Sequence, residues 1–202
     1  MTRTVAITSE KGGVGKSTLA VHLAGAAQEQ GLRPLLIDED GRVGSSLRWA
    51  ARTGGLPFDV LAAEDVKPKK LAGYDLVVLD TEGRPKRKEL RQLAERADLL
   101  LVPSGVSPLE LDATRELIDF LHAEGAARKT RVALTRVPPV GHAAEDAREG
   151  LRDDGFTVCN AVVRQYAAFG RAAELGVLVR DVPVPRADLA WTDVTALARE
   201  LW

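Results

Sequence analysis

The amino-acid sequence predicts an α/β fold, in which a doubly wound and mainly parallel sheet carries helices on both faces. Short apolar runs alternate along the chain with longer amphipathic stretches, and this alternation is typical of strands joined through crossover helices. Several apolar runs contain almost no polar residue, as expected for strands that are covered on both faces. A glycine-rich segment joins the first apolar run to the first amphipathic stretch.

The expected elements follow from these patterns in chain order. The apolar runs predict strands at residues 4–8, 34–38, 76–80, 99–102 and 131–134. The amphipathic stretches predict helices at residues 17–30, 86–97, 109–124, 143–153, 166–175 and about 189–201. Gly176 stands at the C-cap position of the fifth helix. We expect the last two helices to pack on the core through Tyr166, Phe169 and Leu175, and through Ala190, Val194, Leu197 and Leu201.

Length and composition favour one globular domain over residues 1–202. Apolar residues make up 45% and charged residues 28%, and the net charge is −1, so any binding to nucleic acid must come from a local basic cluster. The only cysteine, Cys159, excludes an internal disulfide and fits a reducing compartment. No apolar run approaches ~18 residues and no signal peptide is evident. We therefore expect a cytoplasmic protein without integral membrane association.

Residues 9–18, with the sequence SEKGGVGKST, have the composition and position of a phosphate-binding loop. Glycines let backbone N–H groups turn toward a β-phosphate, and the N-terminus of the following helix adds its dipole. We expect Lys16 to reach the β- and γ-phosphates and the Ser17 hydroxyl to bind Mg²⁺. The predicted cofactors are ATP and Mg²⁺, and the predicted binding residues are Lys11, Gly12, Gly13, Val14, Gly15, Lys16, Ser17 and Thr18.

The loop departs from the usual GxxxxGK[ST] pattern, because Glu10 stands where glycine is required and Lys11 follows it. The variant KGGVGKS resembles the deviant Walker A family, which includes the ParA and Soj partition ATPases, MinD and the nitrogenase iron protein. In that family, the residue that matches Lys11 reaches the partner's phosphates across a nucleotide-sandwich dimer. The resemblance therefore implies a homodimer in the ATP state, in which a cation supplied in trans is worth roughly 10³–10⁵ in rate. The alternative is that Lys11 is a solvated loop lysine.

Two aspartate-rich segments extend the resemblance. In LLIDED, Asp38 and Asp40 end a predicted strand, and the family residue matching Asp40 helps to hold Mg²⁺ and to position the attacking water. In YDLVVLDTEG, Asp80 resembles the Walker B carboxylate that holds Mg²⁺. Because parallel strands bind ligands at their carboxyl ends, we expect a metal site made of Ser17, Asp38, Asp40 and Asp80. The resemblance makes Lys11, Lys16 and Asp40 the candidate catalytic residues.

Two positions depart from the family pattern. Arg42 stands where a glutamine is often found, and Glu82 replaces the usual proline after Asp-Thr. These departures concern hydrolysis and the switch loop rather than binding. They leave open a scaffold that binds ATP without cleaving it.

Later segments supply candidates for contact with the adenine. In LTRVPP, the resemblance points to Thr135 and Arg136, and the loop at 183–185 offers Pro183 and Val184 against the purine. Simple turn chemistry with an exposed Arg136 is the alternative.

The sequence lacks the additions that mark several members of the family. One cysteine cannot supply the cluster ligands of the iron protein. The last helix carries a net negative charge, unlike a MinD-type membrane anchor. No helix-turn-helix precedes the first predicted strand, so we expect no operator reading. What remains by resemblance is a short partition ATPase of the ParA, ParF and Soj type.

Such an ATPase would bind DNA non-specifically as an ATP dimer on the nucleoid, until a centromere-binding or adaptor protein stimulates hydrolysis. Three clusters could meet DNA, although a cluster of this kind is more often a solvated face: Lys67, Lys69 and Lys70; Lys86, Arg87, Lys88 and Arg91; and Arg128, Lys129 and Arg131. The alternatives are a MinD-like or other positioning or assembly ATPase with a protein or membrane-associated cargo, and a synthetase of the dethiobiotin type. Lys11 counts against the synthetase.

Overall fold

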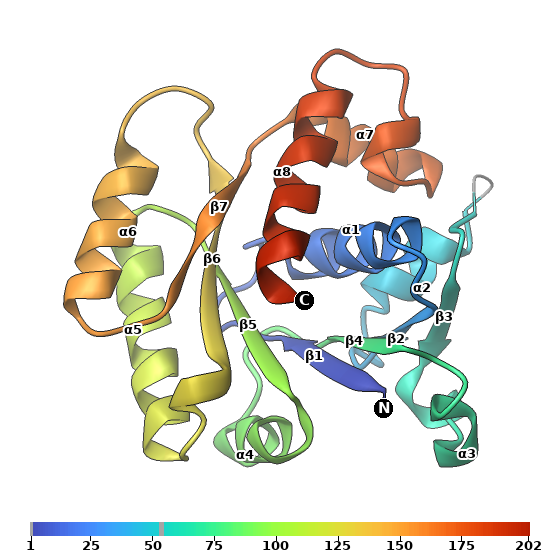
Figure 1. Ribbon diagram of the computed structural model, residues 1–202, viewed down its shortest axis with the longest axis horizontal. Coiled ribbons are helices and arrows are strands. Elements are labelled where there is room, and N and C mark those ends of the chain that lie inside the picture. Colours follow the sequence, from blue (N-terminus) through green and yellow to red (C-terminus); the bar gives the residue numbers. More distant parts are fainter. Residues whose placement is uncertain (1, 53–54) are drawn as a thin grey trace.

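The computed structural model describes residues 2–52 and 55–202. Its centre is a seven-stranded sheet with helices on both faces (Figure 1). The strands run in the order β3-β2-β4-β1-β5-β6-β7, and every neighbouring pair is parallel. The predicted α/β fold class is therefore confirmed, and the sheet is parallel throughout.

The central strands agree with the prediction, whereas the edges of the sheet do not. The predicted strands at 34–38 and 76–80 match to the residue, and those near 100 and 131 extend further than expected. The two edge strands, β3 and β7, were not predicted. The bounds are β1 (Arg3–Ile7), β2 (Pro34–Asp38), β3 (Asp59–Ala62), β4 (Leu76–Asp80), β5 (Leu99–Ser104), β6 (Thr130–Val137) and β7 (Val158–Arg164).

The six predicted helices begin and end within two residues of their expected bounds. They are α1 (Lys16–Glu29), α4 (Arg87–Arg96), α5 (Pro108–Ala123), α6 (Ala143–Asp153), α7 (Ala167–Leu175) and α8 (Ala187–Leu201). The short helices α2 (Ser45–Ala50) and α3 (Pro68–Leu71) were not predicted. Gly176 ends α7 in the left-handed region with φ 73°, as expected. None of the helices that the structure describes combines the length and the apolar character needed to cross a membrane.

Alternate residues of each central strand point to opposite faces of the sheet and build separate cores. Val5 and Ile7 of β1 pack with α1 and α8 on one face, whereas Ala6 packs with α4 and α5 on the other. A third cluster joins α5 and α6 to β6 and β7. The expected apolar stripe of α8 is buried, and Tyr166, Phe169 and Leu175 pack against the same core. Helices α1, α7 and α8 therefore cover one face of the sheet, and α4 and α5 cover the other.

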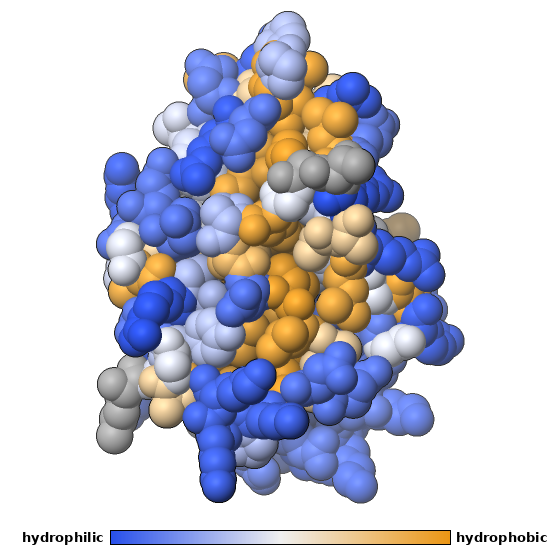
Figure 2. Space-filling model, turned by 90° about the vertical axis from the view of Figure 1, so that its right-hand side faces the viewer, coloured by the Kyte–Doolittle hydropathy of each residue, from blue (hydrophilic) through white to orange (hydrophobic). Residues whose placement is uncertain are grey.

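The free edge of the sheet at β3 is apolar on both faces. Half-buried Val60 packs on the cluster around α1, and half-buried Leu61 packs on the opposite cluster. Figure 2 views the molecule from the side on which β3 and α3 lie, and an apolar band runs down this face between hydrophilic flanks. This four-residue edge strand was not among the predicted elements.

His22 connects the helix that follows the glycine-rich loop to the C-terminal part of the chain. Its ring is fully buried in α1, with Nδ1 2.6 Å from the Thr18 carbonyl oxygen, and Nε2 accepts the Val179 N–H at 3.0 Å. Trp49 and Phe169 meet the ring edge to face. Burial lowers the pKa of His22 to about 4, although the hydrogen bond to Thr18 partly offsets this effect. The ring is therefore neutral in the folded protein.

This buried histidine predicts a loss of stability in mild acid. Because the pKa of His22 falls from 6.5 to about 4 on folding, the unfolded chain takes up the proton first. The contribution of neutral His22 to the free energy of unfolding is complete above pH ~6.5. It is lost as the pH falls toward 4, and the total loss is about 3 kcal/mol. Urea unfolding of His22→Gln should show a shallower fall in unfolding free energy between pH 7 and pH 5 than the wild type. The exposed His142→Gln is the control, and equal slopes for wild type and His22→Gln would contradict the assignment.

Candidate functional site

The glycine-rich loop between β1 and α1 forms an open turn at the carboxyl end of the sheet. Gly13 and Gly15 adopt left-handed backbone with φ 78° and 90°, a conformation that side chains other than glycine rarely tolerate. A Cβ added at Gly12, Gly13 or Gly15 would meet none of the atoms around it within 4 Å, so the space next to these glycines is open. The α1 helix starts directly after the turn, and its N-terminal N–H groups are therefore available to an anion.

Lys16 lies buried under this turn. Its Nζ donates a hydrogen bond to Ser9 Oγ at 3.2 Å, and Ser9 Oγ in turn donates to the Lys11 carbonyl oxygen at 2.7 Å. Burial lowers the pKa of Lys16, and the nearby carboxylates of Asp80 and Asp40 partly offset this effect. The predicted phosphate lysine and two predicted metal ligands are therefore brought together.

The Asp80 carboxyl group is buried at the end of β4, with 2% of the residue exposed. Ser46 Oγ donates to its Oδ2 at 2.7 Å, whereas Oδ1 has no hydrogen-bond partner among the described residues. Burial raises the pKa of Asp80 to about 6, against the lowering effect of the Ser46 and Ser17 hydroxyls. A buried oxygen without a partner is rare and fits a group that receives a hydrogen bond from bound ligand or water.

The two other predicted carboxylates hold the chain after β2. Asp38 Oδ1 accepts the Asp40 N–H, and its Oδ2 accepts the N–H groups of Ser46 and Leu47, so this carboxylate fixes the start of α2. Asp40 is half-buried, and its Oδ1 accepts the N–H groups of Arg42 and Val43. Asp38 therefore supports the backbone, and a direct metal role for Asp38 and Asp40 stays a prediction.

The donors fit a metal ion that is shared with a nucleotide. In residues 2–52 and 55–202, no group of three or more His, Cys, Asp or Glu side chains could hold a metal alone. Mg²⁺ typically keeps several waters and takes one or two carboxylates together with substrate phosphates. The Ser17 hydroxyl and the free oxygen of Asp80 match that requirement.

Thr135 and Arg136 reach the loop from the end of β6. Thr135 Oγ1 donates to the Val14 carbonyl oxygen at 2.8 Å, and an Arg136 guanidinium nitrogen donates to the Gly13 carbonyl oxygen at 2.8 Å. Arg136 has φ 53°, which is uncommon for a residue other than glycine. Both side chains thus hold the backbone of the loop.

Thr135 and Arg136 also line a pocket of about 190 Å³ beside the loop, together with Gly13, Gly15, Thr18, Leu19, Val163, Arg164, Phe169 and Val194. Their contact with the base stays a prediction. Pro183 and Val184 line a separate hollow of about 600 Å³ with Arg180 and Trp191. The two hollows share no lining residue, so the four predicted base contacts fall into two groups.

Sequence reasoning missed Ser46, Arg164 and Asp193 at this site. The Arg164 Nε donates to Asp193 Oδ2 at 2.9 Å, which fixes a wall of the pocket beside the loop. Ser46 lies in the polar segment after Asp40, and that polar stretch after a strand end was the only available signal. Its contact with Asp80 joins residues 34 positions apart and has no local pattern.

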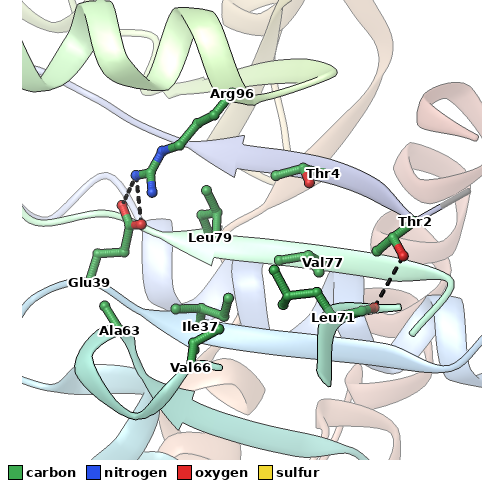
Figure 3. Close-up of a pocket in the computed structure, with 10 residues that line it drawn as sticks. All are labelled: Thr2, Thr4, Ile37, Glu39, Ala63, Val66, Leu71, Val77, Leu79 and Arg96. Carbon is green, nitrogen blue, oxygen red and sulfur yellow. Dashed lines mark hydrogen bonds and ion pairs between the residues drawn. The ribbon is translucent and has the colours of Figure 1, made fainter. Parts of the chain in front are cut away.

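A further pocket, of about 460 Å³, lies outside this cluster (Figure 3). Ile37, Val77 and Leu79 form its apolar floor on the sheet. At one end Arg96 donates two hydrogen bonds to Glu39, at 2.6 and 2.8 Å. Burial raises the pKa of Glu39, and Arg96 partly offsets that effect. None of the predicted site residues lines this pocket.

Comparisons with known proteins place the chain in a nucleotide-binding family and show the fold of solved members. Residues 5–179 match the model of the CobQ/CobB/MinD/ParA nucleotide binding domain. A protein of Gloeobacter kilaueensis named maintenance of carboxysome distribution protein A is 38% identical, covering 98% of this chain and 94% of that protein. The solved MinC:MinD cell division complex of Aquifex aeolicus superposes with a TM-score of 0.77 at 18% identity, over 98% of this chain and 95% of the other. The septum site-determining protein MinD of Pyrococcus horikoshii, complexed with Mg-ADP, superposes with a TM-score of 0.69 at 18% identity, over 100% and 96%.

The buried Asp80 carboxyl predicts a stability cost in the protein without nucleotide and Mg²⁺. Its pKa rises from 3.8 to about 6 on folding, so stability falls as the pH rises from 4 to 6, and the full cost of about 3 kcal/mol applies above pH 6. In urea unfolding at pH 7.5 without Mg²⁺, Asp80→Asn should be more stable than the wild type by roughly 1–3 kcal/mol. Near pH 4 the difference should vanish. The half-buried Asp40→Asn serves as the control, and an Asp80→Asn protein that is less stable at pH 7.5 would disprove the assignment.

Proposed function

Because the chain belongs to the CobQ/CobB/MinD/ParA nucleotide-binding family, we propose that it is an ATP-driven dimer switch that positions a cellular cargo. The family consists of P-loop ATPases, and ATP with Mg²⁺ is the cofactor pair of this chain. The observation that carries the proposal is the loop itself, with Lys16 buried beneath an open glycine turn beside Asp80. The dimer, the cargo and the surface on which it moves are the proposed parts.

In this proposal, some residues of the site would bind the nucleotide and others would act in its hydrolysis. The backbone N–H groups of the turn and the Lys16 ammonium would bind the phosphates. The Ser17 hydroxyl and Asp80 would hold Mg²⁺, which neutralises phosphate charge when bound. Asp40 would orient the attacking water from the end of β2, and Lys11 of each protomer would reach the phosphates held by its partner. ATP state and dimer state would then change together.

The relatives favour a protein assembly as the cargo. The 38% identical protein of Gloeobacter kilaueensis is named for carboxysome distribution, and its similarity extends over nearly the whole chain. In this proposal the ATP dimer binds DNA non-specifically as a surface, and an adaptor protein on the cargo stimulates hydrolysis. A plasmid or chromosome carried by a centromere-binding partner is the second candidate for the cargo.

The basic clusters differ in how free they are to meet DNA. Arg87 is paired with Glu10 at 3.3 Å and stacks on Phe120, and Arg91 is paired with Glu124 at 2.8 Å. The Lys129 ammonium donates to the Ala97 carbonyl oxygen. Lys86, Lys88 and Arg128 are exposed and form no ion pair with a described residue, so each of these two clusters is only partly free. The lysines at 67, 69 and 70 around α3 form the one cluster whose members are all exposed and all without an ion pair to another described residue. We therefore propose α3 as the DNA-facing cluster.

The switch predicts a dimer that depends on the nucleotide. In sedimentation with ATP, Asp40→Ala should be dimeric because it retains ATP, and it should be monomeric with ADP or without nucleotide. Lys11→Ala should bind nucleotide but remain monomeric, since the cation that crosses the interface is lost. Lys16→Ala should lose nucleotide binding, because the phosphates lose their main charge-assisted contact. Monomeric Asp40→Ala in ATP would refute the switch.

Non-specific DNA binding predicts a strong dependence on salt. If a dimer neutralises about five phosphates, log K for duplex DNA should fall with log[salt] at a slope of about −4.5. Replacing Lys67 and Lys69 by alanine should flatten that slope, and adding Lys70→Ala should flatten it further, whereas the Lys86→Ala, Lys88→Ala variant, which also removes two charges, should not. The measurement is fluorescence anisotropy of labelled duplex with Asp40→Ala in ATP. A slope near zero for the parent dimer would rule out the DNA surface.

A further inference from the structure

Ser46 connects the two aspartate-bearing strand ends of the site. Its side chain is fully buried in the first turn of α2, the short helix after Asp40. The hydroxyl donates to Asp80 Oδ2 at 2.7 Å, and the backbone N–H donates to Asp38 Oδ2 at 2.9 Å. One residue thus contacts a carboxylate from β4 and another from β2.

The contact leaves one Asp80 oxygen available and fixes the direction in which it points. A hydroxyl has one hydrogen, and at Ser46 it is directed to Oδ2. Oδ1 is buried and has no partner among the described residues, and the carboxyl group to which it belongs lies near the Lys16 ammonium and the Ser17 hydroxyl. Rotation of the carboxyl group about its terminal bond would cost the bond to Ser46. Oδ1 is thereby kept toward the site that we assign to Mg²⁺.

The same contact joins the metal side of the site to the segment that carries Asp40. Gly44 N–H donates to the Asp40 carbonyl oxygen at 2.7 Å, and Asp38 accepts the Asp40 N–H as well as that of Ser46. Displacement of Asp80 would therefore shift Ser46 at the start of α2. Because Asp38 binds the N–H groups of both Ser46 and Asp40, the shift would reach Asp40 as well.

We infer that Ser46 is a positioning residue that orients the Asp80 carboxylate for Mg²⁺ and couples it to the segment of Asp40. The inference rests on the proposed role of Asp80 in holding Mg²⁺. Groups that orient a metal ligand are typically worth 10–100-fold in metal affinity. Loss of the Ser46 hydroxyl should therefore weaken the effect of Mg²⁺ on nucleotide binding while leaving the phosphate contacts of the loop intact.

The test is a titration with a fluorescent N-methylanthraniloyl ADP, in EDTA and in Mg²⁺. Ser46→Ala should bind the probe as the wild type does in EDTA but should need about 10–100-fold more Mg²⁺ for the same gain in affinity. Ser46→Thr, which keeps the hydroxyl, should restore the Mg²⁺ response. Turnover of Ser46→Ala should likewise recover at high Mg²⁺, which a general loss of structure would not permit.

Ser104→Ala is the control, because Ser104 is also fully buried and its hydroxyl forms hydrogen bonds that do not involve Asp80: it donates to the Gly105 carbonyl oxygen and accepts from the Thr114 hydroxyl. A Ser46→Ala protein with a normal Mg²⁺ response, with equal weakening in EDTA and Mg²⁺, or with the same defect as Ser104→Ala would overturn the inference. The Asp80→Asn variant distinguishes failure of the proposed metal role of Asp80 from failure of the positioning role of Ser46. If it keeps the Mg²⁺ response, the proposed metal role of Asp80 fails; if it loses the response and Ser46→Ala does not, only the inference about Ser46 fails.

Discussion

The site depends on the burial of the Lys16 ammonium and the Asp80 carboxyl at the same edge of the sheet. Burial disfavours the charged form of each, and their mutual attraction offsets only part of that cost. In return, each group has few competing waters when it meets phosphate or a metal ion, and electrostatic interactions are stronger at low dielectric. The apolar packing of β1 and β4 between α1 and α4 supplies the stability that such an arrangement requires.

The register of the parallel sheet brings these groups together. Asp38 of β2 lies beside Asp80 of β4, and Ile7 at the end of β1 lies on the other side of Asp80. Because all three strands point the same way, the loop after β1 and both aspartates meet at one edge. The Glu39 N–H donates to the Asp80 carbonyl oxygen and continues this register by one residue. Glu39 itself lines the separate pocket with Arg96. Asp38 and Glu39 are therefore neighbours in the chain but belong to different sites.

The sequence was sufficient for the parts of the fold that have a repeating or local pattern. The central strands are buried on both faces and read as apolar runs, and α6 was predicted to the residue. The loop and Asp80 were found because short motifs at strand ends carry their own chemistry. Ser46, Arg164 and the loop contacts of Arg136 could not be found this way, since their partners come from distant positions in the chain. The prediction missed the edge strand β7 because the exposed Asn160 interrupts its apolar pattern. The pairing of β7 with β6 is irregular as well, with two shifts in register.

The departures from the family pattern fall on side chains and not on the backbone that builds the binding site. Arg42 is exposed, and its contribution to the turn is an N–H bond to Asp40 that any residue except proline supplies. Glu10, which replaces the standard glycine, forms an ion pair with Arg87 at the start of α4 and so ties the loop to the segment after Glu82. That segment includes Arg84 at φ 61°, a backbone conformation with a strain cost. The backbone N–H groups of the loop do not depend on which side chains stand at these positions. The departures therefore bear on the proposed hydrolysis step, in which side chains act, rather than on the proposed phosphate contacts of the loop.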